Sequence, residues 1–248
     1  MPKQEVIEKE QEPVKEPYYD YISRTDVIGL MGPNAAQTFA IRDEDGKLKS
    51  NQAIGMDTPW HHVAHMPGAK CDIWHQVEFD MMGPQLPQKF VPVGCQNCWK
   101  VVVRPKTLKQ LFQLEKIQEG MNKPSKCGIE PRTSVHGLYG GYFYNNSLEQ
   151  GLTRYTQVRA AVDKVMGKDV VVLLKRGCTE FELALGDSKK WTVYDWQIPI
   201  EEATEDTLAQ DNVDRQQPEH LVRHIHRKWI EWAYTYGDES YKEFTGGK

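Results

Sequence analysis

The chain is organised around residues 90–103, which read Phe90-Val-Pro-Val-Gly-Cys95-Gln-Asn-Cys98-Trp99-Lys100-Val-Val-Val103. This stretch holds the only close pair of cysteines and runs into a valine-rich segment that predicts a buried strand. Two thiols at this spacing can bind one soft metal ion or close a redox disulfide. The disulfide is the weaker interpretation, because a reactive pair is typical of a helix N-terminus and this pair precedes a strand.

Hydrophobic patterning predicts six elements after the cysteine pair. In chain order they are a strand at 99–104, a helix at 105–120, two short strands within 133–144, a helix at 146–167 and a strand at 169–174. The segment 122–131 is expected to be a loop, and the two short strands require a turn at Gly140-Gly141. The order strand, helix, strand, strand, helix, strand is that of the ferredoxin-like fold.

The sequence therefore predicts an α+β protein with a ferredoxin-like split βαββαβ core over about 90–198. The expected sheet order is 4-1-3-2, and a hairpin of strands at 179–185 and 191–198 completes the core. Around it we expect a charged arm at 1–17, an irregular and β-rich N-terminal subdomain at 18–89, and an acidic linker with a C-terminal helix at 199–248. If 139–144 were a single strand, a parallel βαβαβ sheet would be the alternative.

Four cysteines form the expected site, namely Cys95, Cys98, Cys127 and Cys178. In the split fold, the first pair precedes strand one, Cys127 precedes strand two, and Cys178 follows the antiparallel strand four, so all four meet at one edge of the sheet. Thiolates suit an iron–sulfur cluster, with zinc as the alternative. In a parallel sheet Cys178 would lie roughly 20 Å away. The alternative is that no metal is bound and that Cys127 and Cys178 are simply small side chains buried in the core.

A second group of possible ligands precedes this segment. His61, His62 and His65 fall on a short helix predicted from Asp57, and Cys71 and His75 fall on a strand predicted at 71–79. His61 and His65 are spaced to share a metal, but the glutamate of the metalloprotease pattern is missing, so surface histidines are the simpler interpretation. Cys71 or a histidine could replace one of the four cysteines.

Composition limits the function classes. The lack of a long apolar run and of an apolar N-terminal segment predicts an intracellular, cytoplasmic protein without a membrane span, and the net charge of −4 disfavours indiscriminate nucleic-acid binding. Five cysteines argue against a secreted disulfide framework. No phosphate-binding loop, nucleophile elbow or carboxylate pair is recognisable, so the sequence indicates no catalytic residues.

The leading hypothesis is a metal-binding protein with a structural or electron-transfer role. One alternative is a structural subunit of a large assembly that contacts other subunits through the arm at 1–17. The other is a single-stranded nucleic-acid binder that uses the basic segment Lys100–Arg132 and the aromatic residues at 139–144.

Overall fold

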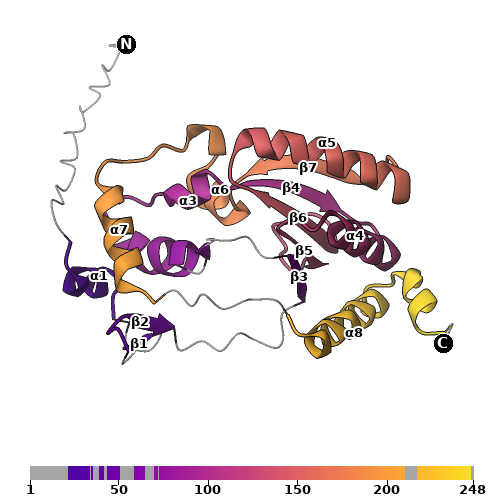
Figure 1. Ribbon diagram of the computed structural model, residues 1–248, viewed down its shortest axis with the longest axis horizontal. Coiled ribbons are helices and arrows are strands. Elements are labelled where there is room, and N and C mark those ends of the chain that lie inside the picture. Colours follow the sequence, from indigo (N-terminus) through magenta and orange to yellow (C-terminus); the bar gives the residue numbers. More distant parts are fainter. Residues whose placement is uncertain are drawn as a thin grey trace, which may run out of the picture.

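The structure is a computed structural model, which describes residues 22–33, 35, 39–41, 44–50, 59–64, 70–71, 73–209 and 217–246. It is a mixed α/β protein with a two-stranded and a five-stranded antiparallel sheet (Figure 1). The large sheet has the order β3-β5-β6-β4-β7. Its strands are β3 (Trp60–Ala64), β4 (Trp99–Arg104), β5 (Ser125–Ile129), β6 (Tyr139–Asn145) and β7 (Val171–Arg176).

The last four strands lie in the order β7-β4-β6-β5, which is the order expected from the sequence. The second and third of these strands in chain order, β5 and β6, come from different residues than expected. β5 lies in the segment predicted to be a loop, and β6 is one continuous strand, so the turn at Gly140-Gly141 was wrong. A Cβ atom at Gly141 would lie 2.3 Å from Leu114 Cδ2. The glycine therefore lets a helix approach the strand rather than reverse the chain.

Three helices cover one face of the large sheet: α4 (Leu108–Met121), α5 (Leu148–Val165) and α8 (Glu219–Thr235). Thr107 and Ser147 cap the N-termini of α4 and α5 by accepting from the backbone three residues on. The apolar stripe of α4 packs on Val101 and Val103, and Trp229 of α8 is fully buried in the same core. This face is the main hydrophobic core of the protein.

The first described segments of the chain pack on a helix that comes late in the sequence. A second core joins α1 (Arg24–Leu30), β1 (Phe39–Ile41), β2 (Leu48–Ser50) and α7 (Gln197–Thr207). Leu48 also pairs with Leu208 in an isolated bridge. The first part of the expected acidic linker is therefore the helix α7, with Ile200 and Glu201 buried.

The prediction of a β-hairpin at 179–198 was wrong. This segment forms α6 (Thr179–Leu185) and the short 3₁₀ turn η3 (Ser188–Lys190) before α7 begins. A strand would need a whole face of alternating residues to be buried. Phe181 is fully buried and Leu185 packs on the same cluster, whereas Leu183 is 68% exposed, so the buried positions follow helical spacing and not alternation.

Two predictions before residue 90 were also wrong. The predicted strand at 71–79 is the π-helix η1 (Ile73–Met82), which leads into η2 (Gly83–Gln85) and α3 (Val93–Gln96). The predicted helix carrying His61 and His62 is the edge strand β3. Gln217 satisfies its outer backbone groups, because its side chain accepts from His62 N and donates to the Trp60 carbonyl. His65 and the arm at 1–17 lie outside the described residues.

The chain ends with α8 and the 3₁₀ segment η4 (Glu239–Phe244). Asp238 joins η4 to the sheet and to α4. Its Oδ2 atom accepts from Leu108 N at 2.5 Å and from the Tyr139 hydroxyl at 2.7 Å. Among the helices of the described ranges, none has the length and apolar character needed to span a bilayer.

Candidate functional site

Three of the predicted cysteines lie at one edge of the large sheet, where β4 begins and β7 ends. Trp99 at the start of β4 pairs with Arg176 at the end of β7. Beyond this pair, Gly177 N donates to the Cys98 carbonyl at 2.8 Å. Cys95 lies in α3 and is buried, while Cys98 and Cys178 are partly exposed. The antiparallel register thus brings together segments that are eighty residues apart in the chain.

The structure separates Cys127 from these three. It lies in the middle of β5 instead of before the strand, because β5 begins at Ser125. Its side chain is fully buried in the core beneath α4, α5 and α8, and burial raises its pKa well above the usual value. Successive side chains of a strand point to opposite faces. Cys127 therefore lies on the helix-covered face, opposite Lys126.

Cys71, which is exposed and lies two residues before η1, is within electrostatic reach of Cys95 and Cys98 instead. Burial, followed by interaction with Cys178 and Cys71, raises the pKa of Cys95. Burial also raises the pKa of Cys98 to about 11, with Lys100 opposing the change and Cys178 and Cys71 adding to it. Each thiol is thus within electrostatic reach of others in this group. Across the described ranges, no three of these sulfur atoms lie within 4.8 Å of one another.

Lys100 places a positive charge beside these thiols. It is 8% exposed, and its Nζ donates to Cys178 Sγ at 2.6 Å. His75 of η1 also forms a hydrogen bond with Cys178. Burial alone would raise the pKa of Cys178, but Lys100 and His75 outweigh it and lower the pKa from 9.0 to about 6. Cys178 is therefore a thiolate at neutral pH.

A second lysine lies next to the thiols. Lys126 of β5 is partly buried, with its Nζ 4.9 Å from the centre of the Trp60 ring. Burial lowers its pKa, and Lys100 lowers it further, while Cys178 and Cys71 act in the opposite direction. Two ammonium groups that repel each other thus lie beside one group of thiols. We refer to Cys71, Cys95, Cys98, Cys178, Lys100 and Lys126 as the thiol site.

Most of the other cations in the basic segment Lys100–Arg132 make ion pairs within the chain. Lys106 pairs with Asp169, Lys109 with Glu243, Lys116 with Glu119, and Arg132 with Glu130. Lys100 and Lys126 face the thiols. These contacts leave this segment less positive charge for phosphate groups than its composition alone indicates.

Sequence reasoning named Cys71 only as a possible substitute. It expected Lys126 to offset the charge of bound thiolates, but it placed Lys100 only in the basic segment considered for nucleic acid. A signal for Lys100 was present, since Trp99-Lys100-Val101-Val102-Val103 places the lysine on the opposite side of the strand from Val101 and Val103. The position of Cys71 had no such signal, because it depends on how η1 packs against the sheet edge.

No protein-family model, curated protein sequence or solved structure matches this chain.

Proposed function

We propose that this protein binds an iron–sulfur cluster through Cys71, Cys95, Cys98 and Cys178. The observation that carries the proposal is the buried Lys100, with its ammonium group 2.6 Å from a thiol sulfur and Lys126 close by. Cysteine thiolates are the usual ligands of such clusters. When bound, the cluster would supply one-electron transfer chemistry.

Charge balance supports this assignment. A buried ammonium group is costly unless an anion compensates it. One thiolate at Cys178 offsets Lys100. Among the described side chains Lys126 has no ion-pair partner, and Cys178 and Cys71 would favour its charge if they were ionised. Metal binding deprotonates thiols. Four thiolates on a cluster would provide negative charge for both lysines.

The spread of the thiols favours a cluster over zinc. Four sulfur atoms on one zinc ion would lie ~3.8 Å apart, given Zn–S bonds near 2.3 Å. Among the described side chains, no three of these sulfur atoms approach within 4.8 Å of one another. Ligands of a four-iron cluster lie roughly 6 to 7 Å apart, which suits a wider arrangement.

The core is also proposed to belong to the ferredoxin-like class. In support, the four strands β7-β4-β6-β5 are antiparallel neighbours, and α4 and α5 connect β4 to β5 and β6 to β7 on one face. β3 adds a fifth strand beside β5. This fold class carries many activities, so the function proposed above depends on the thiols and not on the fold.

The test is the metal content of the full chain purified under anaerobic conditions. We expect the visible absorption of a cluster, with iron and acid-labile sulfide in equal amounts. Cys71→Ser, Cys98→Ser and Cys178→Ser should each lose the cluster, and Cys127→Ala is the matched control that should keep it. Iron X-ray absorption of the unmodified protein, which needs no variant to fold, should report sulfur ligands only.

Three outcomes would contradict the proposal. Stoichiometric zinc in place of iron would replace the cluster with a zinc site. A requirement for Cys127, or none for Cys71, would overturn the ligand set. A metal-free protein in which Cys178 alone reacts rapidly with iodoacetamide would identify a reactive thiolate instead, since Cys178 is the thiol of this site whose pKa falls below its usual value.

A further inference from the structure

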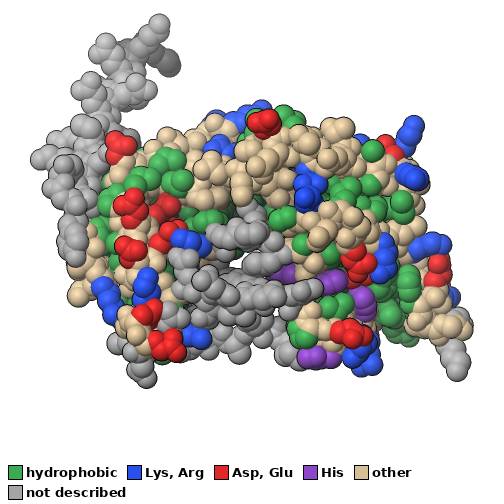
Figure 2. Space-filling model, viewed as in Figure 1, with side chains coloured by type: hydrophobic (Ala, Val, Ile, Leu, Met, Phe, Trp, Pro, Cys, Tyr) green, Lys and Arg blue, Asp and Glu red, His purple; other side chains and the backbone are tan. Residues whose placement is uncertain are grey.

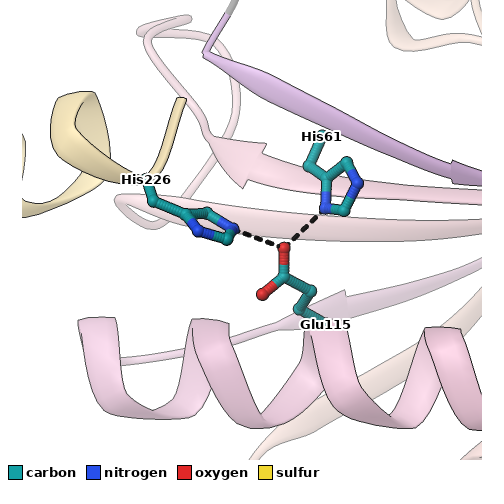
Figure 3. A group of neighbouring side chains, drawn as sticks. All are labelled: His61, Glu115 and His226. Atoms are coloured by element: carbon teal, nitrogen blue, oxygen red, sulfur yellow. Dashed lines mark hydrogen bonds and ion pairs between the residues drawn. The ribbon is translucent and has the colours of Figure 1, made fainter. Parts of the chain in front are cut away.

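A second group of possible ligands lies on the helix-covered face, away from the thiol site. Figure 3 shows His61 of β3, Glu115 of α4 and His226 of α8 converging on one point. His61 Nδ1 is 2.5 Å and His226 Nε2 is 2.7 Å from the same carboxylate oxygen, Glu115 Oε1. One potential ligand atom from each residue lies within 4.8 Å of the other two.

The surroundings hold these side chains in place. Glu115 lies on the buried stripe of α4, one residue after Leu114, and is 1% exposed. The ring centres of Phe112 and Trp229 lie 5.1 Å and 5.0 Å from that of His226. The three side chains therefore come from three elements that the main core already positions, which is what a preorganised site requires.

Among the described side chains, no permanent cation forms an ion pair with Glu115. Glu115 is buried, and its Oε1 atom accepts hydrogen bonds from both imidazoles, which is the arrangement expected of a carboxylate. Within the described part of the chain, its ion-pair partners are these two histidines alone. Neutral imidazoles donate hydrogen bonds without supplying positive charge. A buried carboxylate of this kind is stabilised by a metal ion or by a protonated histidine.

We propose that His61, Glu115 and His226 bind a divalent transition-metal ion, with zinc as the best fit. Two imidazole nitrogens and one carboxylate oxygen are a common ligand set for this ion. Around a four-coordinate ion with bonds near 2.0–2.1 Å, the ligand atoms lie roughly 3.3 Å apart. The ion would occupy the place of the two hydrogen-bonded protons, and each neutral imidazole would then carry its proton on its other ring nitrogen. The ligating nitrogens need to move from Glu115 Oε1 by less than about 1 Å.

The site has a route to solvent. Histidine side chains gather at the molecular surface around β3 and α8 in Figure 2, and the side chain of His226 is 29% exposed. His61 and Glu115 are far more buried. An ion can therefore enter past His226, and water can fill the fourth position. Bound zinc would also connect α8 to β3 and α4, elements that are distant in the sequence.

The test is zinc stoichiometry after the full chain is dialysed against Zn²⁺ and then against metal-free buffer. Glu115→Gln and His226→Ala should each bind one ion fewer per chain than the unmodified protein. His220→Ala, on the exposed side of the same helix, should show no loss. Cys178→Ser should retain this ion, which separates the site from the thiol site.

A measurement on the unmodified protein covers the case in which a variant does not fold. Zn²⁺ should shift the imidazole NMR signals of His61 and His226 and leave that of His220 in place. Unchanged signals, or equal stoichiometry in the unmodified protein and the two site variants, would overturn the proposal. The three residues would then be a hydrogen-bonded contact that holds α8 on the sheet.

Discussion

Glu78 provides the most direct test of the energetics of this fold. It lies in η1, is completely buried, and neither of its carboxylate oxygens has a hydrogen-bond partner among the described residues. Burial raises its pKa from 4.5 to about 9, with Glu201 and Glu205 adding to the effect and Lys70 opposing it. Glu78 is therefore protonated in the folded protein at neutral pH.

The sign of the pH dependence follows from this shift. Between pH 4.5 and about 9, the unfolded chain loses the Glu78 proton and the folded protein keeps it. Stability due to this group is therefore complete below the unfolded pKa and falls as the pH rises. The slope is about 1.4 kcal/mol per pH unit, which gives a loss of about 3 kcal/mol at pH 7. Glu78→Gln has the same shape and no proton to lose, so it should be about 3 kcal/mol more stable than the unmodified protein at this pH.

The assay is urea unfolding followed by circular dichroism at several pH values. From about pH 5.5 to about pH 8, the difference in unfolding free energy between Glu78→Gln and the unmodified protein should grow by about 3 kcal/mol. Glu202→Gln, an exposed position of α7, is the control and should change stability by less than about 0.5 kcal/mol. If the unfolding free energies of Glu78→Gln and the unmodified protein changed with pH in parallel, the assignment of a buried neutral carboxyl group would be refuted.

Four further substitutions test the packing of the sheet and the helices on it. Gly128→Ala should destabilise the protein by at least about 2 kcal/mol, since its Cβ would lie 2.2 Å from the Pro59 carbonyl oxygen. Gly120→Ala, in open space on α4, should stabilise the protein by up to about 1 kcal/mol. Similar thermal unfolding temperatures of the two variants would contradict this. Asp238→Ala should cost about 2–4 kcal/mol because it leaves a backbone amide and a buried hydroxyl unpaired, and denaturant unfolding checks it. Trp229→Ala should cost about 3–5 kcal/mol and increase amide exchange in α8; unchanged exchange there would argue against docking through this side chain.

The elements that local patterning predicted correctly are those with a complete apolar stripe. α4 buries Leu108, Leu111 and Leu114 at helical spacing, and β4 carries consecutive valines. Such segments need one conformation to bury their apolar side chains, whichever neighbours they meet. The same is true of α5, whose Ser147 cap marks its start.

The elements that patterning missed depend on their neighbours. β5 reads Ser-Lys-Cys-Gly-Ile, which has little strand character, and it becomes a strand because β6 and β3 offer backbone partners on both sides. Phe181 and Leu183 alternate like a strand, yet only Phe181 finds a buried position. Tertiary hydrogen bonding and burial override weak local preference in such segments.

The sequence by itself determined the position of Cys95, Cys98 and Cys178, because each adjoins the end of a strongly patterned strand and strand direction fixes which edge it occupies. Only the tertiary structure decided that Cys127 points into the core, that Cys71 comes within electrostatic reach of the other thiols, and that His61, Glu115 and His226 meet. The physical reason is that the face of Cys127 depends on β5, which forms because its neighbouring strands offer partners, and the other contacts depend on how separate elements dock. Neither leaves a local trace in the chain.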